Sequence, residues 1–308
     1  MTLLNRHGVI NNTYGKRGVI NDTYGKAARF DIVRGMNEDE LRAVCPSVFA
    51  RTAHESRSER FAPIPTIEVL RGLRKEGFEV VGAKQSLTRI EGKAPFTKHL
   101  IRIRRMDADK SYSVGDTVAE MLLKNANDGT SVYDLFAGLF RIRCLNSLVA
   151  SMGTIDTVKV RHTGKDIVNK VIEGTFSVIE NAKLALAAPE QWSQIQLDRE
   201  ERLAMAEAVR VLRFADPEGN VDTPITAAQI LQTRRSDDNE NNLWTNFNVM
   251  QENVIRGGLK GVTVNENNKR RRFSTKEVRG IDNDIKLNRA LWTLANRMAE
   301  LKGVRIAA

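Results

Sequence analysis

Alternation of arginines with apolar residues constrains the fold of this chain more than any other feature. It occurs at residues 98–105, with the sequence KHLIRIRR, and again at residues 140–146, with the sequence FRIRCLN. Because successive side chains of a β-strand point to opposite faces, the spacing predicts two strands, each with a buried face and a row of exposed positive charge. An amphipathic helix over residues 135–149 is the alternative for the second stretch, although Gly138 weakens it.

A third basic segment, residues 269–272, consists of four successive cations in an Asn-rich stretch that we expect to form a loop or hairpin over residues 261–273. Cations on a sheet face and in a loop suit contact with the phosphates of a polyanion. The alternative for each segment is a solvated surface that balances nearby carboxylates. The candidate nucleic-acid-binding residues are Lys98, Arg102, Arg104, Arg105, Arg141, Arg143, Lys269, Arg270, Arg271 and Arg272.

The remaining pattern predicts an α+β protein, in which helices flank a small antiparallel β-meander and a mainly helical C-terminal half follows. Strands are expected at residues 79–90, 96–106, 117–126, 131–141 and 158–162, with Asp128-Gly129 as a hairpin turn. Helices are expected at residues 37–44, 66–75, 166–187, 189–214, 226–232, 243–256 and 282–302, with a polar linker or exposed loop at 236–242. The predicted division is an arm at 1–30, an α+β core at 31–163 and a mainly helical part at 164–308.

The N-terminal arm contains a tandem repeat, because residues 8–16 (GVINNTYGK) recur as residues 18–26 (GVINDTYGK). Two copies are too few for a solenoid. We interpret them as a local duplication in a mobile arm, and the alternative is an arm that pairs with a neighbouring subunit or a ligand. A homo-oligomer is expected on the second interpretation.

Composition favours a soluble protein with an anionic partner. The chain has 308 residues, a formal net charge of +10 and 41% hydrophobic residues, which is enough for a core. It has no apolar run long enough to span a membrane and no signal-peptide pattern, so we expect no membrane association. The two cysteines, Cys45 and Cys144, stand outside any paired motif, as is typical of a reducing cytoplasm.

No catalytic constellation is apparent in the sequence. We find no paired carboxylates, no nucleophile with its base and no phosphate-binding loop, and His99 has no evident partner. We therefore expect no enzymatic activity, no cofactor and no metal. Tyr112, Tyr133 and Phe96 are the candidates for stacking on bases, whereas the three tryptophans are expected in the core.

Several segments resemble the phage- and plasmid-borne family called domain of unknown function 932, over residues 37–301. The segments are residues 45–50 (CPSVFA), 63–70 (PIPTIEVL), 77–78 (GF), 96–99 (FTKH), 127–131 (NDGTS), 138–146 (GLFRIRCLN) and 251–253 (QEN). The resemblance implies a mobile-element origin and hence a bacterial cytoplasm. The order of elements is also similar in topology to the phage single-strand annealing proteins of the Erf, Red-beta and RecT type, which hold single-stranded DNA in a basic groove.

These observations lead to one main hypothesis and one alternative. The main hypothesis is a non-enzymatic protein that binds and anneals single-stranded DNA in recombination. The alternative is an anti-defence protein or inhibitor of a host nuclease, which would act by binding a host protein. An unrecognised nuclease would require a carboxylate cluster that the sequence does not display.

Overall fold

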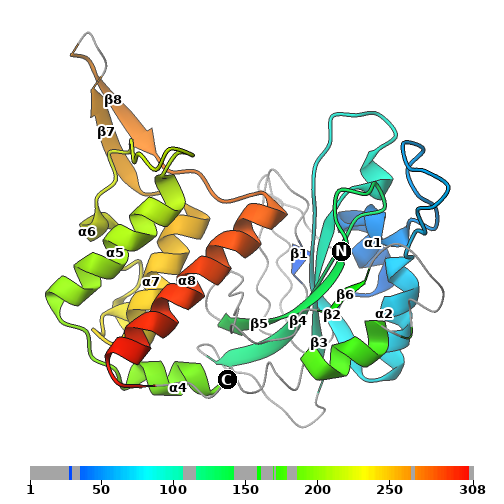
Figure 1. Ribbon diagram of the computed structural model, residues 1–308, viewed down its shortest axis with the longest axis horizontal. Coiled ribbons are helices and arrows are strands. Elements are labelled where there is room, and N and C mark those ends of the chain that lie inside the picture. Colours follow the sequence, from blue (N-terminus) through cyan, green and yellow to red (C-terminus); the bar gives the residue numbers. More distant parts are fainter. Residues whose placement is uncertain are drawn as a thin grey trace, which may run out of the picture. The chain divides into compact units, whose positions relative to one another are not determined.

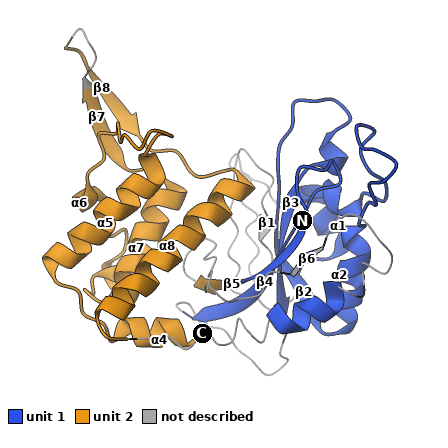
Figure 2. Ribbon diagram, viewed as in Figure 1, with its two compact units in different colours: residues 1–138, 155–183 blue, residues 139–154, 184–308 orange. Residues whose placement is uncertain are grey.

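The computed structural model of the chain (Figure 1) describes residues 28–29, 35–106, 116–141, 158–160, 169, 171–178, 186–264 and 268–304. The chain divides into two compact units (Figure 2). The first comprises residues 1–138 and 155–183, and the second comprises residues 139–154 and 184–308. The tandem repeat, Arg143, Cys144 and Tyr112 lie outside the described residues.

An antiparallel sheet forms the centre of the first unit, and its strands follow one another in chain order. The strands are β1 (Ala28–Arg29), β2 (Phe78–Gln85), β3 (His99–Arg105), β4 (Thr117–Asn125), β5 (Tyr133–Arg141) and β6 (Val158–Val160). The predicted meander and the α+β class are confirmed. Since β5 is a strand through residue 141, a helix beginning at residue 135 is wrong.

The turn between β4 and β5 forms where the sequence places it. Gly129 adopts a positive φ of 76°, which its lack of a side chain permits. The side chain of Asp128 fixes this turn, because its Oδ1 accepts hydrogen bonds from Thr130 N at 3.0 Å and from Thr130 Oγ1 at 2.6 Å. The Asp128-Gly129 hairpin signal is therefore confirmed.

Two helices, α1 (Glu38–Val44) and α2 (Thr66–Lys75), cover one face of the sheet (Figure 1). The capping box of α1 is present, since Asn37 Oδ1 accepts from Glu40 N at 2.9 Å and Glu40 Oε2 accepts from Asn37 N at 2.8 Å. Helical residues 171–178 also pack here, although the sequence grouped them with the helical part. The shared core includes Leu41, Ile67, Leu70, Leu73, Ile101, Ile103, Met121, Leu123, Leu135, Val171 and Val178.

The second unit is mainly helical and carries one β-hairpin. Its elements are α4 (Ala187–Ser193), α5 (Arg199–Phe214), α6 (Ala227–Ile230), α7 (Leu243–Arg256), β7 (Lys260–Val264), β8 (Arg270–Ser274) and α8 (Ile281–Leu301). Trp192, Trp244 and Trp292 are buried as predicted, and the ring centroids of Trp192 and Trp292 lie 4.5 Å apart. Among the described residues, no helix has the length and apolar character needed to cross a membrane.

One expectation for the second unit is wrong, and another holds only in part. Residues 189–214 form two helices instead of one, because Asp198 caps α5 through a capping box with Glu201 and so starts a new helix. Residues 236–242 are mostly exposed, as expected of a loop, but Asp238 and Asn242 are buried. Asn242 caps α7 by accepting from Thr245 N at 2.8 Å, and Ser236–Asp238 forms a short 3-10 helix.

Candidate nucleic-acid interface

The expected row of exposed charge on β3 is wrong for Arg102 and Arg104. Both arginines lie against the carboxylate of Glu120 on β4, and the side chains of Arg102, Arg104 and Glu120 are only 12%, 6% and 0% exposed. Arg102 donates to Glu120 from Nε at 2.6 Å and from Nη2 at 2.9 Å, and Arg104 donates from Nε at 3.2 Å. The second face of the sheet therefore buries an ion-pair cluster at this place.

The electrostatics of the cluster keep Glu120 ionised. Burial raises the pKa of Glu120, but the charges and hydrogen bonds of Arg102 and Arg104 outweigh it, so that the pKa is lowered overall. Gly82 pairs with Arg102 across the strands, and a Cβ at Gly82 would lie 3.3 Å from Arg102 Cδ. The missing side chain leaves room for the arginine.

Glu120 was not among the predicted site residues, although the sequence carries a signal for it. Glu120 is the carboxylate in the middle of an otherwise mostly apolar strand, with Val118 and Leu122 on the same face. A charged residue at such a position is buried only when it is paired. The two alternating arginines of the predicted neighbouring strand were the available partners.

Among the residues that the structure describes, the remaining predicted cations, Lys98, Arg105 and Arg141, do not form a single exposed row. Lys98 precedes β3 and is half-buried, whereas Arg105 at the end of β3 is exposed. Arg141 at the end of β5 is held by Asp238, with 3.0 Å between Arg141 Nη1 and Asp238 Oδ1. Its side chain is only 13% exposed, so its charge is largely used inside the second unit.

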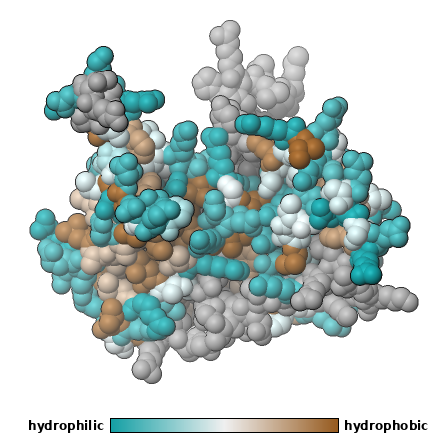
Figure 3. All heavy atoms as spheres, turned by 45° about the horizontal axis from the view of Figure 1, so that its top comes forward, coloured by the Kyte–Doolittle hydropathy of each residue, from teal (hydrophilic) through white to brown (hydrophobic). Residues whose placement is uncertain are grey.

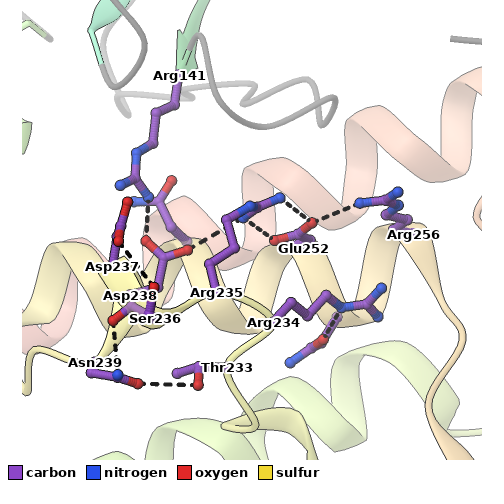
Figure 4. A network of polar contacts seen from close by, with 12 residues as sticks. Arg141, Thr233, Arg234, Arg235, Ser236, Asp237, Asp238, Asn239, Glu252 and Arg256 are labelled. Atoms are coloured by element: carbon purple, nitrogen blue, oxygen red, sulfur yellow. Dashed lines mark hydrogen bonds and ion pairs between the residues drawn. The ribbon is translucent and has the colours of Figure 1, made fainter.

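Asp238 belongs to a chain of alternating charges in the second unit (Figure 4). Arg235 contacts Asp238 Oδ2 at 3.3 Å and Glu252 through two hydrogen bonds of 2.7 Å, and Arg256 reaches the same Glu252 at 3.0 Å. The carboxylates of Asp238 and Glu252 are nearly fully buried. This network stabilises α7 and the preceding 3-10 helix, and it leaves Arg141 poorly placed to bind a phosphate.

The segment 269–272 has a different environment. The alternative of a hairpin over 261–273 is confirmed, because β7 and β8 pair antiparallel, with Val264 opposite Arg270 and Val262 opposite Arg272. The side chains of Arg270, Arg271 and Arg272 are exposed. Within the described part of the chain, no carboxylate lies at ion-pairing distance from these three arginines.

The base of the hairpin is fixed to the second unit. Gln229 Nε2 donates to the carbonyl of Lys260 at 2.7 Å, and a Cβ at Gly261 would lie 2.8 Å from Pro224 Cγ, so the chain packs closely there. Thr275 N donates to the Leu259 carbonyl at 2.9 Å. Strands β7 and β8 project from the helices (Figure 1), and hydrophilic residues gather at the upper left of Figure 3.

A shallow pocket of about 390 Å³ lies at the base of the hairpin, and Lys260 and Arg234 are two of its lining residues. Arg234 Nε donates to Asn253 Oδ1 at 2.7 Å, and Arg234 Nη2 donates to the carbonyl of Gly257. Burial lowers the pKa of Arg234, although a guanidinium stays protonated at any physiological pH. The pocket therefore adds two cations to the three exposed arginines of β8.

Two of the aromatic stacking candidates are within the described residues. Tyr133 is fully buried, so its prediction is wrong. Phe96 is half-buried, and its ring meets that of His54 edge to face at 5.5 Å between centroids. Neither residue lies on the β7–β8 hairpin.

His99 has the partners that the sequence did not reveal. Its Nδ1 lies 2.9 Å from Ser47 Oγ, and its Nε2 lies 2.9 Å from Thr66 Oγ1, in a fully buried position. Asn125 Nδ2 continues the network by donating to Thr66 Oγ1 at 3.0 Å. Among the residues that the structure describes, no three His, Cys, Asp or Glu side chains are placed to hold a metal ion.

Comparison with known proteins places the chain in a family. The family described as domain of unknown function (DUF932) matches residues 53–292. Two proteins of Escherichia coli (strain K12), UPF0380 protein YafZ and UPF0380 protein YfjQ, are 41% and 40% identical to this chain over 265 residues. Each alignment covers 86% of this chain and 92% of the relative.

No solved structure matches the chain. The topological similarity to annealing proteins stays a prediction, whereas the resemblance to the DUF932 family is confirmed over residues 53–292. The chain belongs to the DUF932 family.

Proposed function

We propose that this chain binds nucleic acid through the β7–β8 hairpin, with Arg270, Arg271 and Arg272 contacting phosphates. The observation that carries the proposal is the exposure of three successive arginines with no carboxylate of the described residues at ion-pairing distance. Uncompensated exposed cations attract a polyanion, and the release of its counterions drives binding.

The proposed binding surface is the β7–β8 hairpin and not the sheet of the first unit. Arg102 and Arg104 neutralise Glu120, and Arg141 pairs with Asp238, so a phosphate would have to compete with a buried carboxylate at each place. At Arg270, Arg271 and Arg272, a phosphate would not have to displace any carboxylate of the described residues. Lys260 and Arg234 at the base extend the positive surface.

Holding a phosphate backbone needs no nucleophile and no general base. The function we propose is therefore binding without a chemical step, as in a protein that protects, bridges or aligns nucleic acid. Annealing of single strands is one such role, and it depends on the same phosphate contacts.

The test is a salt titration of binding to a fluorescent oligonucleotide, followed by anisotropy. The triple variant Arg270→Gln, Arg271→Gln, Arg272→Gln removes the proposed contacts. Its matched control, Arg60→Gln, Lys75→Gln, Arg89→Gln, removes the same charge from exposed positions of the first unit. Circular dichroism verifies that both variants fold.

We expect the wild type and the control to bind at low salt and the hairpin variant to bind weakly. The plot of log affinity against log salt should flatten by about 0.7 to 0.9 for each phosphate contact that is lost. Equal losses in the two variants would show a general charge effect. Failure of the wild type to bind at low salt would overturn the proposal.

A further inference from the structure

The β7–β8 hairpin carries arginines on both of its faces. The register pairs Val264 with Arg270, Thr263 with Arg271 and Val262 with Arg272. Because side chains alternate along a strand, Arg270 and Arg272 share one face, and Arg271 points to the other. A flexible single strand that lies along a ribbon contacts one face, whereas the walls of a duplex groove present phosphates to both faces.

The width of the hairpin determines which groove of a nucleic-acid duplex can hold it. Two paired strands lie about 4.8 Å apart, and a ribbon with its side chains fits the major groove of B-form DNA, which is about 12 Å wide. The minor groove of undistorted B-form DNA is about 6 Å wide, so the ribbon would enter it only if the duplex were bent and the groove widened. The major groove of duplex RNA is deep and narrow, and side chains cannot read it.

Two further features of the hairpin suit binding in a groove: its base is anchored, and one of its faces carries an exposed aliphatic side chain. Its base is held by Gln229 and packs on Pro224, so β7 is anchored to the second unit where the hairpin begins. Val262 lies on the face of Arg270 and Arg272 and is 53% exposed. Val262 lies opposite Arg272, and an exposed aliphatic group beside a cation suits contact with the methyl group of thymine in a major groove.

We infer that the β7–β8 hairpin enters the major groove of double-stranded DNA, with Arg270 and Arg272 reaching one phosphate strand and Arg271 reaching the other. The inference rests on the proposed function and names its substrate class. It differs from the expectation of single-stranded DNA, which depended on a row of arginines along β3.

The first experiment compares three ligands of equal length: duplex DNA, one of its single strands, and duplex RNA of the same sequence. Anisotropy at several salt concentrations should show the tightest binding to duplex DNA. Equal or tighter binding of the single strand or of duplex RNA overturns the groove inference and leaves the proposed function standing. Absence of binding to all three overturns both.

The second experiment asks whether both faces of the ribbon take part. Arg271→Gln and Arg272→Gln should each weaken duplex binding and each lower the salt slope by about 0.9, because each removes one phosphate contact. Arg297→Gln, at a position whose side chain is 72% exposed on α8, is the matched control and should leave binding unchanged. Loss of affinity in only one of the two hairpin variants means that the ribbon lies flat on its ligand, and it overturns the inference.

The third experiment blocks one groove at a time. Methyl green occupies the major groove, and netropsin occupies the minor groove. Methyl green should displace the protein from duplex DNA, and netropsin should not. The reverse result overturns the assignment to the major groove.

Discussion

Arg102 Nε donates a hydrogen bond of 2.6 Å to Glu120 Oε2, and this contact joins β3 to β4 through a carboxylate whose side chain has no exposed surface. The alternating arginines of β3 are therefore part of the interior of the first unit. A buried carboxylate of this kind is retained only with its partners, because a lone charge in the interior is costly. The contact shows why a basic strand pattern alone does not identify a binding surface.

Replacing Glu120 by Gln should destabilise the first unit strongly. The substitution removes the buried negative charge that both Arg102 and Arg104 contact, and breaking a buried ion pair from one side costs about 3–5 kcal/mol. Urea unfolding followed by circular dichroism measures the change in the free energy of unfolding.

The matched control for this variant is Glu68→Gln on α2. Glu68 pairs with Arg51 and Arg71, but its side chain is 40% exposed. Exposed ion pairs contribute about 0.2–1 kcal/mol, so the control should unfold at nearly the wild-type urea concentration. Similar destabilisation in both variants would contradict the buried role of Glu120.

The stability of the wild type should depend on the ionisation of Glu120 at acid pH. Its pKa is lowered in the folded state from an ordinary value of 4.5. A lowered folded pKa means that the stabilisation is fully present above the unfolded pKa and is lost as the pH falls through the folded pKa. The difference in unfolding free energy between the wild type and Glu120→Gln should therefore be largest near neutral pH and shrink below pH 4.5.

Urea unfolding of both proteins in buffers from neutral to acid pH measures that difference. Other carboxylates titrate in both proteins, so their contributions cancel in the comparison. A difference that stays constant down to the acid limit would mean that Glu120 does not gain its stability from ionisation.

Much of the fold could be predicted from the sequence because the signals are local. The capping box of α1 needs only Asn37 and Glu40, which are three residues apart, and the end of α2 needs only the flexible Gly77. Alternating apolar residues likewise fix the strands of the meander. Each of these patterns lies within one helix or strand. Its prediction therefore does not depend on which distant residues pack against that element.

The candidate site could not be predicted so well, because it depends on contacts between distant residues. Arg141 and Asp238 are 97 residues apart in the chain, and nothing near Arg141 indicates that its charge is compensated. Glu120 is nearer to Arg102, but its pairing depends on the register between β3 and β4. The exposure of Arg270, Arg271 and Arg272 agrees with the basic, polar sequence around them, whereas their role in binding stays a prediction.

Cys45 should be inert toward thiol reagents in the folded protein. Burial raises the pKa of Cys45 to about 12, although hydrogen bonds from Ser47 and Val48 oppose the shift. The reactive species is the thiolate, so a buried thiol with this pKa reacts slowly at about pH 8. In the variant Cys144→Ser, we expect Ellman's reagent to label Cys45 in urea and not in native buffer.

Labelling in urea is the control, because it shows that the reagent reacts with Cys45 once the thiol is exposed. Rapid labelling of the native variant would show that the first unit opens at Cys45. It would also contradict the packing of Cys45 in the core beside α1.

The glycine that joins α7 to the hairpin should tolerate no side chain. Gly257 has φ 71° and ψ −157°, a conformation that only glycine adopts readily, and a Cβ there would lie 2.6 Å from the carbonyl carbon of Lys276. The backbone strain alone costs about 1–3 kcal/mol, and the overlap adds to it. Gly219 is the matched control in the same unit, because its φ is also positive at 88° but a Cβ at this glycine would meet no atom within 4 Å. In urea unfolding, Gly257→Ala should therefore lower the free energy of unfolding more than Gly219→Ala. Equal losses would mean that the backbone at Lys276 shifts to accommodate the Cβ without a loss of stability.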